Sequence, residues 1–332
     1  MMAYISVIGA GSWGTALSIL LAEKGYDVSL WTYEQELAEE MERDRVNRLY
    51  LPEASLPDNV RTTHRLNRAL HRSRYVICAV PTQFVRQVFS EAVGHIEKGA
   101  VIVSASKGME KGTLLTVSSI LKELTHHETA VISGPSFAKE VIRKLPTAVT
   151  LAVQHRETGL LLQEIFNTDY FRVYTHQDVL GVELGGALKN VIAIASGISD
   201  GLGLGLNARA TLITRGLAEI TRLGVKMGAD AKTFSGLSGM GDLVLTCTGN
   251  LSRNYTVGYK IGRGMKLKDI LSEMRAVAEG VETSVSACEL AVKYDVEMPI
   301  VEQVCLMLHK DKPPQAAVRE LMTRPLKEEF YY

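Results

Sequence analysis

Two polar residues interrupt an apolar stretch in the C-terminal half of the chain. Residues 182–196 are apolar on nearly every helical face, and Lys189 and Asn190 break the run near its centre. This pattern predicts a buried helix. Because burial lowers the pKa of a lysine, Lys189 becomes able to donate a proton near neutral pH. Reduction of a ketone by hydride needs such a donor, and Asn190 would orient the substrate. The alternative is a lysine whose side chain reaches water at a domain boundary.

A carboxylate follows in the next motif. The Gly-rich turn at residues 236–241 places Asp242 directly before an apolar stretch. A buried carboxylate needs a cationic partner or several hydrogen-bond donors, and Lys189 is the obvious cation. The alternative is that Asp242 only caps a helix.

Another predicted helix begins with Ser252, Arg253 and Asn254. Arginine binds a phosphate dianion through paired hydrogen bonds, and the free amides of a helix N-terminus add to this attraction. The segment therefore predicts a phosphate-binding site, and a plain N-cap is the alternative. None of the eight histidines has the spacing of a metal site, so we predict no catalytic metal.

Two further segments follow predicted strands. Lys107 comes after the strand at residues 100–105, and the segment 133–138 (Ser-Gly-Pro-Ser-Phe-Ala) comes after the next one. In a doubly wound sheet, ligands bind beyond the carboxyl ends of the strands, so both are placed to reach a ligand. A solvated loop lysine and a β-turn with a helix cap are the respective alternatives.

A Gly-rich motif at residues 9–14 lies between a predicted strand and a predicted helix. Gly9 permits the tight turn, Gly11 lets the backbone approach a pyrophosphate, and Gly14 lets the helix pack closely on the strand. The helix N-terminus then offers free N–H groups and a positive dipole end to the phosphates. This context predicts a dinucleotide site, and a Gly-rich turn without a ligand is the alternative.

The choice between NAD and NADP stays open. An acidic residue at the end of the second strand binds the ribose 2′-hydroxyl of NAD, whereas an arginine nearby accommodates the 2′-phosphate of NADP. The chain has Thr32-Tyr33-Glu34 at this place. Arg43 and Arg45 lie further on, and we assign them to a solvated helix face.

These residues need a scaffold in which strands and helices alternate. The first 180 residues do so, with helical stretches such as 15–24 and 83–96, which predicts a mostly parallel sheet with helices on both faces. The predicted strands are residues 4–8, 27–31, 74–80, 100–105, 129–133, 148–152 and 171–174. The later predicted helices are residues 182–196, 209–223, 256–262, 283–293, 301–308 and 315–323. We therefore predict an α/β protein with a Rossmann-type doubly wound domain over residues 1–180 and an all-helical domain over residues 181–332, with an active site between them.

Composition narrows the function classes. Lys+Arg and Asp+Glu both number 37, so the formal net charge is zero and nothing favours nucleic acid as a partner. No basic region precedes the short N-terminal apolar stretch, and no stretch is long enough for a membrane span, which predicts a cytoplasmic protein without membrane insertion. The four cysteines are far apart, so we expect free thiols.

In this order, the motifs resemble those of the glycerol-3-phosphate dehydrogenases of the bacterial, soluble, NAD(P)-dependent kind. The resemblance covers nearly the whole chain and rests on the segments 9–16, 106–110, 133–140, 183–190, 237–248, 252–254 and 277–283. The long helical and Gly-Asp segments are the specific ones, because many enzymes share the first Gly motif.

The resemblance implies a phosphorylated small-molecule substrate, with dihydroxyacetone phosphate reduced to sn-glycerol 3-phosphate for phospholipid synthesis. It also implies a homodimer and a helical domain of the 6-phosphogluconate dehydrogenase type. The cofactor would be NADP or NAD, and only the resemblance favours NADPH. The chain departs from many relatives here, because it has Thr32-Tyr33 where they carry a basic residue after the strand-two tryptophan, and this departure weakens the preference for NADP.

The resemblance also implies a role for individual residues. The catalytic group would be Lys189 as proton donor and acceptor, with Lys107, Asp242 and Thr246. The substrate would be bound by Lys107, Gly134, Ser136, Lys189, Asn190, Asp242, Ser252, Arg253 and Asn254. The dinucleotide would be bound by Gly9, Gly11, Ser12, Trp13, Gly14, Tyr33, Lys107, Ala138, Arg253, Val277 and Glu279.

Two other functions stay open at this point. A ketopantoate reductase or a 2-hydroxyacid dehydrogenase would combine the same two domain types, but it would not need Arg253 to bind a phosphate. A non-catalytic dinucleotide sensor would keep the Gly-rich turn, but it would have no reason to keep Lys189 in an apolar helix.

Overall fold

The computed structural model describes residues 4–274 and 277–329, and it divides into two compact units. The first unit comprises Met1–Lys107 and Leu115–Glu183, and the second comprises Gly108–Leu114 and Leu184–Tyr332. Sequence analysis places the boundary after residue 180. It does not anticipate that the short segment Gly108–Leu114 belongs with the second unit.

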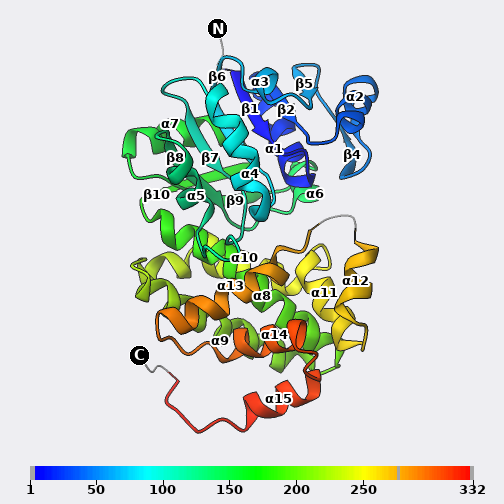
Figure 1. Ribbon diagram of the computed structural model, residues 1–332, viewed down its shortest axis with the longest axis vertical. Coiled ribbons are helices and arrows are strands. Elements are labelled where there is room, and N and C mark those ends of the chain that lie inside the picture. Colours follow the sequence, from blue (N-terminus) through cyan, green and yellow to red (C-terminus); the bar gives the residue numbers. More distant parts are fainter. Residues whose placement is uncertain (1–3, 275–276, 330–332) are drawn as a thin grey trace. The chain divides into compact units, whose positions relative to one another are not determined.

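The first unit contains an eight-stranded sheet with the order β10-β9-β8-β7-β6-β1-β2-β5 (Figure 1). Neighbouring strands are parallel except β8 and β9, which are antiparallel. The strands are β1 (Tyr4–Ile8), β2 (Asp27–Trp31), β5 (Val60–Thr63), β6 (Ser73–Cys78), β7 (Val101–Ser104), β8 (Glu128–Ser133), β9 (Thr147–Ala152) and β10 (Phe171–His176). The predicted mostly parallel α/β sheet is confirmed.

Sequence analysis misses three strands of this unit. The edge strand β5 is short and partly polar, and it pairs with β2 alone, so its sequence carries little apolar alternation. Strands β3 (Val46–Asn47) and β4 (Leu51–Ser55) form a separate antiparallel pair. They are only two and five residues long and have no apolar alternation.

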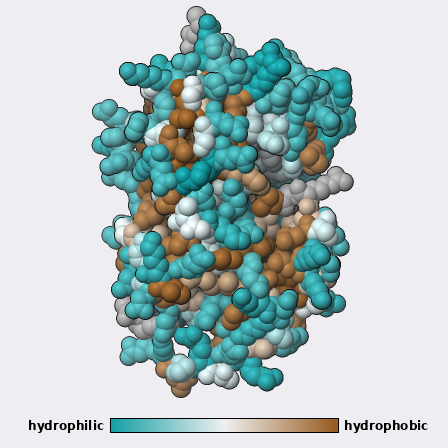
Figure 2. All heavy atoms as spheres, viewed as in Figure 1, coloured by the Kyte–Doolittle hydropathy of each residue, from teal (hydrophilic) through white to brown (hydrophobic). Residues whose placement is uncertain are grey.

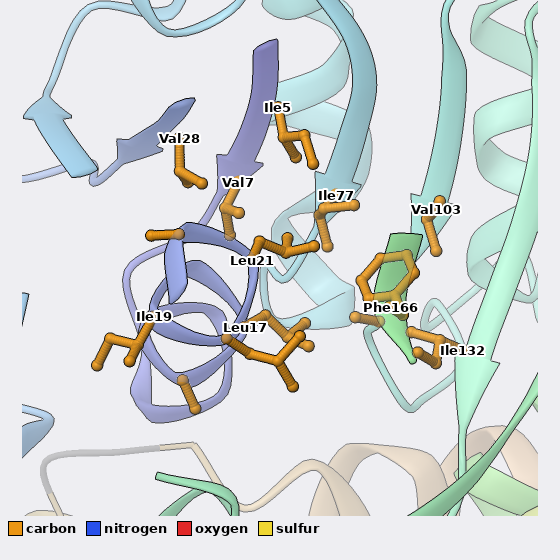
Figure 3. Packing of buried hydrophobic residues seen from close by; sticks show 14 of the residues in the cluster. Ile5, Val7, Leu17, Ile19, Leu21, Val28, Ile77, Val103, Ile132 and Phe166 are labelled. Carbon is orange, nitrogen blue, oxygen red and sulfur yellow. The ribbon is translucent and has the colours of Figure 1, made fainter. Parts of the chain in front are cut away.

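Helices cover both faces of the sheet because successive strand residues point to opposite sides. In β1, Ile5 and Val7 join the core that contains Leu17 of α1 (Figure 3), whereas Ile8 joins the core on the other face. The first face is covered by α1 (Ser12–Glu23), α2 (Gln35–Asp44), α6 (Ala138–Val141) and α7 (Arg156–Phe166). The second face is covered by α3 (Leu66–Ala69), α4 (Thr82–Ala92) and α5 (Val117–Leu124), and the 3-10 turn η1 (Val93–His95) follows α4.

The second unit is built around the long helix α8 (Val179–Gly201). Helix α11 (Arg253–Gly262) packs on it backbone to backbone, because a Cβ on Gly258 would lie 2.0 Å from the Ile194 carbonyl oxygen. The other helices are α9 (Gly205–Lys226), α10 (Asp242–Thr248), α12 (Leu267–Glu273), α13 (Glu279–Lys293), α14 (Pro299–His309) and α15 (Pro314–Met322). Every helix predicted here is present, and the short helices α10 and α12 are additional.

Helix α8 is the one described helix that is long and apolar enough to cross a membrane, but it is a core helix. In its most apolar window 89% of the residues are buried inside the protein. Hydrophilic side chains cover most of the face seen in Figure 2, with apolar side chains gathered in patches between them. All four cysteines are free thiols, as expected.

Candidate functional site

The turn after β1 is shaped by its glycines. Gly9 has φ of +116°, a conformation that side chains disfavour. A Cβ on Gly14 would lie 1.9 Å from the Gly9 carbonyl oxygen, so α1 packs on the turn as closely as glycine permits. A Cβ on Gly11, in contrast, would meet no atom of the described residues within 4 Å. The space beside Gly11, where a side chain would point, is therefore open.

This turn fits a dinucleotide pyrophosphate. Gly11 is the N-cap of α1, and within the described residues no side chain caps that helix. The N–H groups of the first turn and the positive end of the helix dipole therefore face the open space at Gly11. The residues present can hold the two phosphates through backbone amides alone.

Side chains around the turn are placed in different ways. The Ser12 hydroxyl donates to the Tyr50 carbonyl oxygen at 2.7 Å. The Trp13 ring packs against Phe171, with ring centroids 6.4 Å apart, and its buried Nε1 has no hydrogen-bond partner within the described residues. Tyr33, just after β2, is 76% exposed. The roles of Ser12, Trp13 and Tyr33 toward a cofactor remain predictions.

The two arginines beyond β2 differ from each other. Arg43 is exposed and pairs with Asp44, as expected of a solvated helix face. Arg45 does not lie on such a face, and that prediction is wrong. Its side chain is mostly buried and donates to the Val60 carbonyl oxygen at 2.8 Å, because the residue leaves the helix in the left-handed conformation and turns inward.

Lys107 and the segment after β8 meet in the first unit. The Lys107 Nζ donates to the Gly134 carbonyl oxygen at 2.9 Å, and the Ser136 hydroxyl donates to the same oxygen at 3.0 Å. Lys107 is thus tied to this segment. Helix α6 then begins at Ala138, and its N-cap is Phe137 rather than Ser136, so Ser136 does not act as the helix cap.

Lys189 lies in a buried polar cluster of the second unit. Its Nζ donates to Asp242 Oδ1 at 2.6 Å and to the Thr246 hydroxyl at 2.7 Å. Lys189 is 6% exposed and Asp242 is 1% exposed, so the ammonium group does not reach solvent as in the alternative interpretation. Asp242 begins α10 but faces Lys189 instead of capping the helix. Charges this deeply buried require each other.

The spacing of residues along α8 and α10 brings Lys189, Asp242 and Thr246 together. Gly185 and Lys189 are four residues apart and share a face of α8, as Asp242 and Thr246 share a face of α10. A Cβ on Gly185 would lie 2.7 Å from the Ser238 carbonyl oxygen, so the π-helical turn Leu237–Gly241 packs tightly on α8. This contact sets the depth at which Asp242 meets Lys189. Such π-turns often occur at functional sites.

The start of α11 lies beside the same region of α8. Ser252 caps α11 by accepting from the Tyr255 N–H at 3.2 Å, so the plain N-cap interpretation holds for its side chain. Asn254 Oδ1 accepts from the Gly280 N–H at 3.0 Å, and a Cβ on Gly280 would lie 2.7 Å from the Asn190 carbonyl oxygen.

The start of α11 thus lies next to α8 and α13. Arg253 is exposed at the first position of α11, Val277 is exposed, and Glu279 begins α13. An anion bound here would face Arg253 and the amide groups of a helix N-terminus.

A buried, neutral thiol lies near Lys189. Cys247 is fully buried, and burial raises the pKa of its thiol to about 12. It therefore stays protonated and is no nucleophile. Among the described residues no group of three or more His, Cys, Asp or Glu side chains could hold a metal ion.

The chain is similar to known proteins along nearly its whole length. Family models for the N-terminus and the C-terminus of NAD-dependent glycerol-3-phosphate dehydrogenase match residues 4–159 and 178–319. The chain belongs to this family of dehydrogenases. The predicted enzyme class, an NAD(P)-dependent glycerol-3-phosphate dehydrogenase, is thereby confirmed, and so is NAD(P) as the cofactor.

Individual glycerol-3-phosphate dehydrogenases are similar along the whole chain. Those of Citrifermentans bemidjiense and Geobacter sulfurreducens are 57% and 56% identical over 329 residues, which is 98% of this chain and of each relative. The crystal structure from Coxiella burnetii has a TM-score of 0.94 at 42% identity and covers 97% of this chain and 99% of that one. A ketopantoate reductase from Ralstonia eutropha has a TM-score of 0.63 at 14% identity, which shows a shared fold alone.

Helix α10 and the contact made by Asn47 were not predicted from the sequence. The helix α10 was expected only as an apolar stretch, although the spacing of Asp242 and Thr246 is the sequence signal for a shared helix face. Asn47, which contacts the Gly-rich turn, was not singled out. No periodic pattern marks it, because its partners lie far away in the sequence.

Two buried carboxylates outside the site bind helix N-termini. Glu183 accepts from the Ser118 N–H at 2.8 Å at the start of α5. Glu219 accepts from the Ile300 and Val301 N–H groups at 2.8 and 3.2 Å at the start of α14. Burial raises the pKa of Glu183, and it raises that of Glu219 to about 7. Both hold helices in place rather than contact the site.

Proposed function

We propose that the chain catalyses the reversible reduction of dihydroxyacetone phosphate to sn-glycerol 3-phosphate by NADPH or NADH. The observation that carries this proposal is the buried cluster of Lys189, Asp242 and Thr246, because a lysine held this way can pass a proton without contact with bulk water. Membership of the glycerol-3-phosphate dehydrogenase family supports the choice of substrate.

The chain's own contribution to the chemistry is proton transfer and positioning. When bound, the reduced nicotinamide supplies a hydride from C4 to the carbonyl carbon. Lys189 donates a proton to the carbonyl oxygen as negative charge develops there, and it takes that proton back in the reverse reaction. Asp242 and Thr246 hold the Nζ in place and stabilise its positive charge.

The phosphate group of the substrate binds at the start of α11. Arg253 supplies the charge, and the amide groups at Ser252 and Asn254 supply the helix N-terminus. Asn190 orients the substrate next to Lys189. In the first unit, Lys107, Gly134 and Ser136 form the remaining contacts, since the two side chains already converge on one carbonyl oxygen.

The dinucleotide binds to the first unit through the Gly-rich turn, which makes this unit the cofactor domain and the helical unit the substrate domain. Ser12, Trp13, Tyr33 and Ala138 are its further contacts there, and Arg253, Val277 and Glu279 are its contacts in the helical unit. The proposed setting is the cytoplasm, where a homodimer supplies sn-glycerol 3-phosphate for phospholipid synthesis.

The test is the oxidation of NADPH and NADH by the purified protein with dihydroxyacetone phosphate, followed by nicotinamide absorbance. We expect rapid oxidation of at least one cofactor, and the ratio of the two rates decides the preference left open at Tyr33. Binding of both cofactors without oxidation would refute the proposed reaction.

A further inference from the structure

The loop that follows α2 is fastened to the Gly-rich turn by one side chain. Asn47 is fully buried, at 0% exposure. Its Nδ2 donates to the Ala10 carbonyl oxygen at 2.8 Å and to the Thr15 hydroxyl at 2.9 Å. Its Oδ1 accepts from the Tyr50 N–H at 3.0 Å. A single amide thus joins the turn, the first helix and the loop.

The partners fix the orientation of this amide. The Ala10 carbonyl can only accept, so the nitrogen of the Asn47 side chain must face it, and the Tyr50 N–H can only donate, so the oxygen must face that group. If the amide were reversed, its oxygen would face the Ala10 carbonyl oxygen and its NH2 group would face the Tyr50 N–H. An aspartate, which has the same shape, could not donate to Ala10 at all.

Holding the Ala10 carbonyl also fixes the next N–H group. The Ala10–Gly11 peptide is trans, and in a trans peptide the carbonyl of one residue and the N–H of the next point in opposite directions. Because Asn47 draws the Ala10 carbonyl to the buried side, the Gly11 N–H points away from it. The space beside Gly11 is open, because a Cβ added there would meet no atom of the described residues within 4 Å.

A second bond closes the arrangement. The Ser12 hydroxyl donates to the Tyr50 carbonyl oxygen, while the Tyr50 N–H donates to Asn47. The turn and the loop are therefore held at two points, and the Ala10–Gly11 peptide cannot rotate without breaking the bond to Asn47. A preorganised amide of this kind binds an anion at a lower cost than a mobile one.

We propose that Asn47 is a positioning residue for the dinucleotide, which turns the Gly11 amide toward the pyrophosphate by holding the Ala10 carbonyl. The inference rests on the proposed cofactor site in the Gly-rich turn. The pyrophosphate is common to NAD and NADP, so Asn47 acts on both cofactors equally and not on the choice between them.

The experiment measures the Kd of NADH, NADPH and ADP-ribose by calorimetry for the wild type and for Asn47→Ala. ADP-ribose contains the pyrophosphate but no nicotinamide. We expect all three Kd values to rise in parallel by about tenfold, the size that loss of one hydrogen bond produces. At saturating cofactor, kcat stays within about twofold of the wild type. Asn47→Asp, which keeps the shape but cannot donate to Ala10, weakens binding at least as much.

Asn59 provides the matched control. Its Nδ2 also donates to two backbone carbonyl oxygens, those of Ala22 and Tyr26, both at 2.8 Å, but it does so at the other end of α1. Asn59→Ala removes the same kind of bond from the same helix. We expect it to lower the thermal midpoint and to leave all three Kd values unchanged.

Each other outcome decides against the inference or the function. Unchanged Kd values in folded Asn47→Ala or Asn47→Asp would overturn the role of Asn47. An equal rise in Asn59→Ala would also overturn it, because general loosening of α1 would then explain the effect. If the wild type itself binds neither NADH nor NADPH, the proposed cofactor site fails before Asn47 is tested.

Discussion

The two units carry proposed binding groups of different kinds. In the first unit, the turn at Gly9–Gly14 relies on backbone amides and on the absence of side chains. In the second unit, Lys189 and Asp242 are buried charged side chains that hold each other in place. A backbone site therefore fails when something is added, whereas a side-chain site fails when something is removed or exchanged.

This difference matches the two tasks. A pyrophosphate carries its charge already, and it needs several donors in fixed directions. The carbonyl oxygen acquires charge only during the reaction, and it needs a group that can release a proton at that moment.

Replacement of Lys189 gives the largest effect on turnover. Lys189→Ala lowers kcat by about a thousandfold, within the range that general acid catalysis supplies, with the Kd of the cofactor unchanged. Lys189→Arg preserves the charge beside Asp242 but cannot release a proton, so it is equally inactive. Steady-state kinetics with calorimetry measures both quantities.

Lys312 offers a matched control, because it is a largely buried lysine of the second unit that pairs with Glu320 outside the site. Lys312→Ala leaves kcat unchanged. If Lys189→Arg kept turnover within about tenfold of the wild type, charge alone would suffice and the proton-transfer role would be wrong.

Arg253→Ala weakens binding of the substrate and leaves the chemical step unchanged. We expect the KM for dihydroxyacetone phosphate to rise by between about tenfold and a hundredfold, since a charge-assisted contact is lost. When NADH or NADPH is saturating, so that the proposed cofactor contact of Arg253 does not limit the rate, we expect turnover of dihydroxyacetone, which lacks the phosphate, to stay the same. Arg263→Ala removes an exposed arginine at the other end of α11 and serves as the control. Equal loss with both substrates would assign Arg253 a role other than phosphate binding.

Two glycines of the turn separate packing from ligand binding. Gly11→Ala adds a methyl group to open space, so the protein keeps its thermal midpoint while its Kd for NADH and NADPH rises by about tenfold. Gly14→Ala drives a methyl group against the Gly9 carbonyl, so the thermal midpoint falls as well. Gly94→Ala, also in open space but outside the turn, changes neither. A fall in the midpoint of Gly11→Ala would show that the space is not open.

Glu219 gives the smallest effect, a change in stability with pH. Burial raises its folded pKa to about 7, above the value of 4.5 that applies without burial, so the native state binds the proton more tightly. The free energy of unfolding therefore falls as the pH rises from 4.5 to 7, by about 3 kcal/mol. Glu219→Gln does not titrate, so this loss disappears from its urea unfolding curves.

A comparison with Glu320 tests the direction in which the free energy of unfolding changes with pH. Glu320 is exposed, and its hydrogen bond with Lys312 is the leading cause that lowers its pKa. Its contribution is present at neutral pH and is lost as the pH falls, so Glu320→Gln changes the slope in the opposite direction. A wild-type slope identical to that of Glu219→Gln would mean that burial does not raise the folded pKa of Glu219 above its unfolded value.

The sequence could predict much of the fold because its signals are local. The apolar alternation of the buried strands and the Gly-rich motif depend on neighbouring residues, and all seven predicted strands are present. The edge strand β5 was missed because it is short, partly polar and paired with β2 alone, and the β3–β4 pair was missed because its strands are only two and five residues long. Arg45 was misplaced because its carbonyl partner lies on another strand.

By itself, the sequence determined the α/β sheet, the helical second half, the dinucleotide motif and the candidates Lys189 and Asp242. The tertiary structure confirmed the predicted contact of Lys189 with Asp242, and it alone decided that Lys107 and Ser136 converge on Gly134 and that Asn47 holds the Gly-rich turn. Strand and helix periodicity is written into residues a few positions apart. A hydrogen bond such as that between Asn47 and Ala10 depends on how distant segments pack, which no local pattern records.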